Sequence, residues 1–190
     1  RGLGTGGNAE QTVPSPQSPA PISIADIGTG SGVLAVCAAK YVSNSHVTAI
    51  AISSAALAVA KRNAERHRVA ERVEFIESDL FANVSAERHF DYIISNPPYI
   101  TTAEMLALPA DVRDHEPRVA LDAGERGTDV IAPLVQQAAS RLKPGGALLI
   151  EISPMIAAEV EQLVRDTPGF QLAPTIRDLA GHQRIVQATK

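Results

Sequence analysis

The residues best suited to chemistry are four in a row, Asn96, Pro97, Pro98 and Tyr99, directly after the buried-strand pattern of residues 90–95. The Asn96 side-chain oxygen and the Pro97 carbonyl are two hydrogen-bond acceptors, and each proline restricts the backbone around them. Two fixed acceptors suit a planar NH2 group, in either an amide or a nucleobase amine, and Tyr99 adds an aromatic wall. A Pro-rich turn after a strand would explain the same residues without a ligand.

A glycine-rich loop lies upstream, between a short apolar run and a helical pattern; it contains Asp26, Gly28, Thr29, Gly30 and Gly32. Glycines let a ligand approach the backbone closely, and the N–H groups at a helix start point at it. The spacing is G-x-G-x-G, with Val33 where a dinucleotide loop needs its third glycine, so the loop favours S-adenosylmethionine over a pyrophosphate. Asp26 can hold the ligand's ammonium directly or through water. A tight βα turn without a ligand is the alternative.

Alternating strand and helix patterns provide the scaffold for these residues. Strands are expected near residues 22–27, 47–52, 73–77, 90–95 and 147–152, helices near 31–42, 54–68, 128–142 and 154–166, and a final strand pair at 170–177 and 184–189. This order predicts an α/β fold, a Rossmann-like open sheet of seven strands, mostly parallel with a C-terminal antiparallel hairpin, and helices on both faces. Ligands of such sheets bind at the carboxyl ends of the strands.

Asp79 follows the third expected strand and therefore falls at the same edge of the sheet as the glycine loop and Asn96. Its carboxylate can accept a hydrogen bond from an adenine amine, with Leu80 or Phe81 packing on the ring. The same aspartate would also serve as a helix N-cap or a turn residue.

Composition sets the bounds. The chain has 190 residues, 45% of them apolar, and a net charge of −4 without a basic run, which argues against sequence-independent nucleic-acid binding. We expect residues 1–21, rich in Gly and Pro, to form a flexible tail or linker and residues 22–190 to form one domain. Cys37 is expected to be a buried thiol in a helix. No membrane span, signal peptide or metal site is expected, and a reducing cytoplasm is the default.

From about residue 22 to its end, the chain resembles class I S-adenosylmethionine-dependent methyltransferases and, more narrowly, the HemK-type release-factor glutamine methyltransferases. The segments that carry the resemblance are residues 26–32, 79–81, 96–99, 108–109, 112–122, Gly124, Gly127, Asp129, 151–152 and 178–184. The Asn-Pro-Pro-Tyr motif alone is shared with adenine and guanine amino-methyltransferases. A related ribosomal-protein glutamine methyltransferase shares the Glu116-Pro117 type of loop.

The resemblance implies methyl transfer from S-adenosylmethionine, with S-adenosylhomocysteine as product, to the amide nitrogen of the Gly-Gly-Gln glutamine in peptide chain release factors. The cofactor-binding residues that it implies are Asp26, Gly28, Thr29, Gly30, Gly32, Ala51, Ile52, Asp79, Leu80 and Asn96. The substrate-binding residues are Asn96, Pro97, Pro98, Tyr99 and Glu116, of which Asn96, Pro97 and Tyr99 are catalytic. A monomeric enzyme with a release factor as its protein partner is expected. Asp178 and Arg184 are expected to hold the terminal hairpin loop together.

The chain departs from the family pattern in two places. Ala51 stands where relatives have an acid that binds the cofactor ribose, a loss of about 1.5–3 kcal/mol, or tenfold to more than a hundredfold in affinity. Relatives also carry an N-terminal helical docking domain, for which residues 1–21 do not substitute. Two other functions stay open. The Asn-Pro-Pro-Tyr motif also suits a nucleobase amino-methyltransferase acting on DNA or RNA, and Ala51 would suit a non-catalytic methyltransferase-fold binding module with weakened cofactor affinity.

Overall fold

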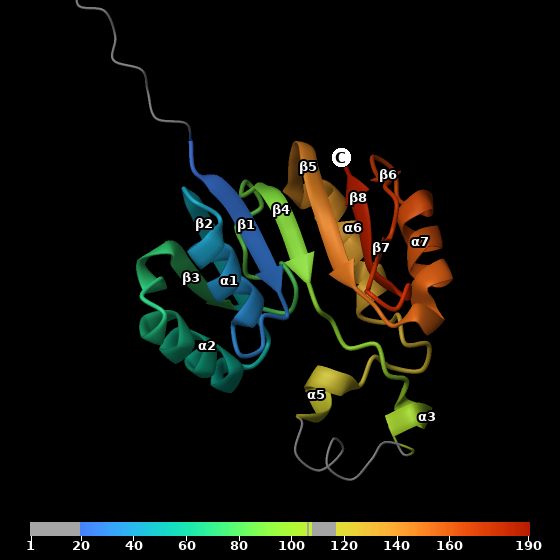
Figure 1. The fold of residues 1–190 in the computed structure, drawn as a ribbon. Helices are drawn as coiled ribbons and strands as arrows, with labels where there is room; N and C mark the ends of the chain where they lie inside the picture. The colour runs from blue at the N-terminus through green and yellow to red at the C-terminus, as the bar shows by residue number, and fades with distance from the viewer. Residues whose placement is uncertain (1–19, 106, 108–116) are drawn as a thin grey trace, which may run out of the picture.

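The protein is described by a computed structural model that covers residues 20–105, 107 and 117–190 (Figure 1). Its centre is an eight-stranded sheet with the order β3-β2-β1-β4-β5-β8-β6, in which β7 also pairs with β8. The strands are β1 (Ile22–Ile27), β2 (Ser45–Ala51), β3 (Val73–Glu77), β4 (Phe90–Ser95), β5 (Leu142–Glu151), β6 (Gln171–Leu172), β7 (Ile176–Arg177) and β8 (Gln183–Thr189). The first five strands are mutually parallel, and β8 runs antiparallel to β5. The predicted α/β class and its antiparallel end are confirmed.

Helices cover both faces of the sheet, as predicted. The four longer helices in the described part of the chain are α1 (Val33–Tyr41), α2 (Ser54–Arg66), α6 (Ile131–Arg141) and α7 (Ala157–Asp166). Because side chains alternate along a strand, Ile24 packs with α1 in one core cluster and Ala25 packs with α6 and α7 in the other. Figure 1 shows α1 in front of β1 and β2, and α6 behind β5.

Local chemistry explains where the observed elements differ from the predicted ones. The predicted strand at 170–177 is two short strands, β6 and β7, with Pro174 between them, because proline cannot donate a backbone hydrogen bond. Strand β5 begins at Leu142, five residues before the predicted start, and its register with β4 shifts between Phe90 and Tyr92. Because the predicted strand at 170–177 is divided into β6 and β7, the sheet has eight strands rather than seven.

The segment between Tyr99 and α6 returns to the same edge of the sheet from which it leaves. It contains the short helices α3 (Thr102–Met105) and α5 (Arg118–Leu121). Ile100 N donates to Leu121 O at 3.2 Å, and Thr102 N donates to Gly124 O at 2.9 Å. The two ends of this long connection are thus tied together beside the strands.

Three expectations concern parts of the chain away from the site. Cys37 is exposed, so the prediction of a buried thiol is wrong; Ala35, Val36 and Ala39 form the buried side of α1, and Cys37 lies off that stripe. The predicted tail, residues 1–21, falls almost wholly outside the described residues. In the described part of the chain, no helix is long and apolar enough to cross a membrane.

Candidate active site

Four parallel strands end side by side and bring the predicted site residues to one edge of the sheet. Gly28 N and Thr29 N each donate to Ile50 O at 2.9 Å, which ties the glycine loop to the end of β2. Ser78 N donates to Ala51 O at 2.9 Å, and this bond joins the ends of β3 and β2. On the other side, the Ser95 hydroxyl donates to Ile27 O at 2.7 Å and joins β4 to β1. The edge thus runs from Asp79 through the glycine loop to Asn96.

The three loop glycines, Gly28, Gly30 and Gly32, all have positive φ, but the space around Gly32 differs from that around Gly28. A Cβ on Gly32 would lie 2.8 Å from Ala60 Cβ, so Gly32 lets α2 pack against the loop. A Cβ on Gly28 would have no other described atom within 4 Å. The backbone of Gly28 therefore faces open space at the end of β1, as a ligand-binding loop requires.

Asp26 is the buried acid beneath this loop, with 1% of its surface exposed. One carboxylate oxygen, Oδ2, accepts hydrogen bonds from the Thr29 hydroxyl at 2.6 Å and from Ala35 N at 2.9 Å. Burial raises the pKa of Asp26 to about 6, although these two donors lower it. The other oxygen, Oδ1, is buried and has no hydrogen-bond partner among the described residues. Asp26 thus orders the loop with one oxygen and offers the second to a donor that the described chain does not supply.

The residues after β2 and β3 complete this half of the edge. Ala51 is buried, whereas the Ile52 side chain is 59% exposed. Asp79 is exposed and Leu80 is half-buried with φ +46°, an uncommon conformation for leucine. Ser78 caps the turn instead of Asp79, because its hydroxyl accepts from Asn83 N at 2.9 Å. Phe81 is 1% exposed and its ring packs on Phe90, so it belongs to the core and does not pack on a ligand.

Asn96 to Tyr99 leave the sheet at the end of β4. Asn96 is exposed, Pro97 is buried, and Pro98 and Tyr99 are half-buried. Asn96 is thus exposed at the sheet edge, directly before a buried proline. The sequence did not single out Gly127 as a support of this segment, although it is one of the family-like glycines. It has φ +75°, and a Cβ there would lie 3.2 Å from the Tyr99 carbonyl oxygen.

The remaining predicted residues have mixed outcomes. Glu116 lies outside the described residues. Glu151 ends β5 and is half-buried, and the turn that follows is capped by Ser153, whose hydroxyl accepts from Met155 N. Asp178 and Arg184 form the expected ion pair, at 2.8 Å, within the terminal hairpin.

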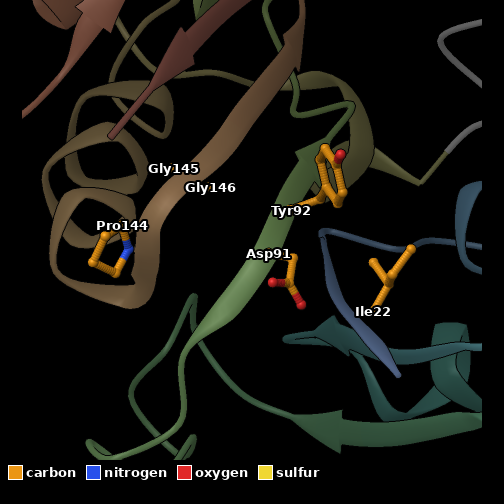
Figure 2. Close-up of a pocket in the computed structure, with 6 residues that line it drawn as sticks. All are labelled: Ile22, Asp91, Tyr92, Pro144, Gly145 and Gly146. Atoms are coloured by element: carbon orange, nitrogen blue, oxygen red, sulfur yellow. The ribbon is translucent and has the colours of Figure 1, made fainter. Parts of the chain in front are cut away.

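One hollow on the described surface lies away from these residues. Its volume is about 210 Å³, and Figure 2 shows its lining residues, Ile22, Asp91, Tyr92, Pro144, Gly145 and Gly146. Ile22 begins β1 and Asp91 is the second residue of β4, so this hollow is at the amino ends of the strands. It is separate from the edge that carries Asp26 and Asn96.

Comparison with known proteins decides the family. Residues 13–109 match the methyltransferase small domain family. The chain belongs to this family. It is 45% identical over 168 residues to a release factor glutamine methyltransferase of Rhodopirellula baltica, a match that covers 88% of this chain and 57% of the relative. A protein of the same name from Gloeobacter violaceus is 37% identical over 192 residues, covering 94% of this chain and 67% of the relative.

The fold agrees with that assignment. The solved 16S rRNA N2 G1207 methyltransferase of T. thermophilus, in complex with AdoMet and guanosine, superposes with a TM-score of 0.64 at 22% identity and covers 88% of this chain and 37% of its own. The methyltransferase chain described here spans a little over half the length of the first curated relatives that it matches.

Proposed function

We propose that this methyltransferase moves a methyl group from S-adenosylmethionine to the side-chain amide nitrogen of a glutamine, in the Gly-Gly-Gln motif of a peptide chain release factor. The observation that carries the proposal is the exposed Asn96 beside the buried Pro97, on the same sheet edge as an open glycine loop. The names of the relatives, release factor glutamine methyltransferase, support the choice of substrate.

The residues of this edge fit the cofactor in two respects. Gly28 leaves open space above the end of β1, and Asp26 Oδ1 is a buried acceptor whose partner is missing from the described residues. The loop and Asp26 would hold the amino-acid end, and Ile52, Asp79 and Leu80 would border the adenosine. When bound, S-adenosylmethionine supplies an electrophilic methyl group and leaves as S-adenosylhomocysteine.

Asn96 and Pro97 address the difficulty that an amide nitrogen is a poor nucleophile, because its lone pair is delocalised into the carbonyl. Asn96 Oδ1 and the Pro97 carbonyl oxygen would accept one N–H each, which fixes the direction of the nitrogen and favours its pyramidal form. Most of the acceleration is then positioning, with a smaller share from stabilising the positive charge that develops on the nitrogen. Once methylated, the nitrogen gives a proton to water, so no strong base is required.

Transfer of labelled methyl groups tests this function. Purified protein is incubated with labelled S-adenosylmethionine and a release factor, with a second release factor whose motif glutamine is alanine, and with ribosomal RNA. We expect label only in the first sample. Label in RNA would assign the nucleobase function instead.

Calorimetric titration with S-adenosylmethionine and S-adenosylhomocysteine tests the cofactor site separately. Micromolar binding by the folded protein is expected. No binding by a folded sample would identify a non-catalytic module, in which Ala51 replaces the ribose-binding acid.

A further inference from the structure

Apolar side chains stand exposed on both sides of Asn96 along the carboxyl edge of the sheet. On the glycine-loop side, Val33 is 62% exposed and Ile52 is 59% exposed. On the other side, beyond β5 and at the turn before β8, Met155 is 82% exposed and Leu179 is fully exposed. The first pair borders the proposed cofactor site. The second pair has no role in the function proposed above.

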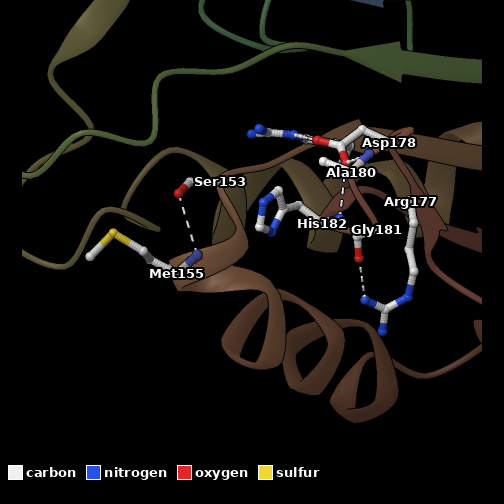
Figure 3. Close-up of polar contacts among 8 residues, drawn as sticks. Ser153, Met155, Arg177, Asp178, Ala180, Gly181 and His182 are labelled. Atoms are coloured by element: carbon white, nitrogen blue, oxygen red, sulfur yellow. Dashed lines mark hydrogen bonds and ion pairs between the residues drawn. The ribbon is translucent and has the colours of Figure 1, made fainter.

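Leu179 sits at the tip of a turn that is held rigidly. The Asp178 carboxylate accepts from Ala180 N and His182 N at 2.9 Å each, and its other oxygen pairs with Arg184 Nε. The backbone closes the turn as well, because Asp178 N donates to His182 O at 2.8 Å. Figure 3 shows these bonds converging on Asp178. Such a network pre-organises the turn, and a pre-organised contact loses little conformational entropy when it binds.

This turn lies close to Met155. Ile152 N donates to Arg184 O at 2.8 Å, so the chain after β5 and the chain before β8 leave the sheet together. Figure 3 places His182 between the Ser153–Met155 segment and Asp178. Met155 and Leu179 are thus exposed apolar side chains on neighbouring segments at the end of one strand pair, and we call Met155 and residues 179–182 the hairpin surface.

The hairpin surface is linked to the candidate active site through Gly127 and Ile156. A Cβ on Gly127 would lie 3.2 Å from the Tyr99 carbonyl oxygen and 3.6 Å from Ile156 Cγ2, and Ile156 directly follows Met155. In the sheet order, β8 lies two strands from β4, a lateral distance of roughly 10 Å. A protein whose glutamine reaches Asn96 can therefore extend over this surface.

We propose that the hairpin surface is a docking site for the protein substrate and contacts apolar side chains beside the target glutamine. This inference rests on the proposed function. Two described cations near the surface are already engaged, since Arg177 donates to Gly181 O at 2.7 Å and Arg184 pairs with Asp178. A nucleic acid would need free cations here for its phosphates, whereas an apolar protein segment needs only Met155 and Leu179.

Polar replacement of both side chains tests the inference. The double variant Met155→Gln, Leu179→Asn is assayed with a whole release factor and with a five-residue peptide centred on Gly-Gly-Gln. We expect the ratio of kcat/KM for the factor to kcat/KM for the peptide to fall about tenfold, the size of effect that a central apolar contact supplies. Tyr41→Ser is the matched control, because Tyr41 is 76% exposed at the far end of α1, and its ratio should equal that of the wild type.

The outcomes separate the two proposals. Methylation of the factor by the wild type, with an unchanged ratio in the double variant, overturns the docking site and leaves the proposed function standing. No methylation of the factor by the wild type overturns both. If sedimentation shows that the double variant loses a dimer while the ratio is unchanged, the hairpin surface joins two copies of the chain and the docking inference is wrong. Because both side chains are exposed, we expect the double variant and the wild type to have equal thermal unfolding midpoints. Equal midpoints exclude a folding defect.

Discussion

The amino and carboxyl edges of the sheet differ in how far their polar groups find hydrogen-bond partners within the chain. Two aspartates on neighbouring strands show this difference most directly. Asp91, near the start of β4, accepts from Ser23 N and from Lys143 Nζ at 2.7 Å each. Partial burial raises its pKa, but the Lys143 and Ser23 hydrogen bonds and the Lys143 charge outweigh burial, so its pKa lies below the ordinary value. At the end of β1, Asp26 is almost fully buried, its pKa is raised, and one of its oxygens lacks a described partner.

Glycines at the two edges of the sheet also differ in what lies beside them. A Cβ on Gly146, at the amino edge, would lie 2.9 Å from Asp91 O, so Gly146 allows the chain to approach itself. Gly28, at the carboxyl edge, has open space where a Cβ would be, so a ligand can approach its backbone. The amino edge also has a hollow of about 210 Å³ (Figure 2), but Asp91, which lines it, is already bonded to Ser23 N and Lys143. Concave shape therefore does not distinguish the two edges, since a second hollow, of about 240 Å³, borders Gly32 of the glycine loop.

The largest effect is expected from Asn96→Ala at the carboxyl edge. Removal of the side-chain acceptor should lower kcat for methylation of a release factor about 100- to 1000-fold, because positioning and charge stabilisation are lost together. Single-turnover transfer of label measures the chemical step directly. Asn96→Asp keeps an oxygen at the same place and should lose less activity than the alanine variant. A kcat within threefold of the wild type for Asn96→Ala would remove Asn96 from the mechanism.

The next effect concerns the pH dependence of stability at the two aspartates. The folded pKa of Asp26 is about 6, above the unfolded value of 3.8, so its contribution to stability is full below pH 3.8 and is lost as the pH rises through 6. Asp26→Asn should therefore gain stability relative to the wild type between pH 4 and pH 7, by up to about 3 kcal/mol.

Asp91→Asn should show the opposite sign. The folded pKa of Asp91 is lowered, so its contribution is present above the unfolded pKa and is lost as the pH falls through the folded pKa. Urea unfolding of the three proteins at pH 4, 5.5 and 7 measures both trends. Parallel pH profiles for Asp26→Asn and Asp91→Asn would show that the two edges do not differ electrostatically.

Short-range patterns predicted most of the carboxyl edge. Asp26, Asp79 and Asn96 each follow a strand pattern, and parallel strands that end together must bring such residues together. Asn96 is exposed and Pro97 is buried, and the two-acceptor interpretation of that segment stays a prediction. The residue-level roles in binding and catalysis stay predictions.

Tertiary packing decided what the sequence could not. Phe81 and Leu80 are adjacent and both apolar, and only the packing of Phe81 on Phe90 shows which of them belongs to the core. Cys37 lies in a helix with alanine and valine on several sides, so periodicity did not reveal its exposed position. Gly127 is 28 residues from Tyr99, and its support of that carbonyl depends on a long connection that no local pattern describes.

Restoring an acid at the end of β2 is expected to produce a smaller but informative gain. Ala51→Asp should tighten S-adenosylhomocysteine binding tenfold to a hundredfold, because a carboxylate there can accept hydrogen bonds from ribose hydroxyls. Ala55→Asp places the same charge on an exposed position of α2 and should leave the affinity unchanged. Calorimetry measures both. Equal affinities for Ala51→Asp and the wild type would show that β2 does not end where the ribose binds.

The smallest effect compares the open glycines of the two edges. Gly28 has φ +72° and Gly145 has φ +77°, and a Cβ on either would have no other described atom within 4 Å. Alanine at either position should therefore lower the free energy of unfolding by a similar amount, about 1–2 kcal/mol, because a Cβ is strained at positive φ.

Only Gly28→Ala should also affect ligand binding, with a loss of about tenfold in affinity for S-adenosylhomocysteine, a difference of about 1.4 kcal/mol. The reason is that the added methyl group would enter the space that the cofactor requires, whereas Gly145 lies at the opposite edge, beside Asp91. Calorimetric titration of the two alanine variants, after their stabilities have been matched by urea unfolding, separates occupancy of that space from backbone strain. If both variants bind equally, the open face of Gly28 is a feature of the turn alone, and the cofactor must approach the sheet from the side of Ile52 and Asp79.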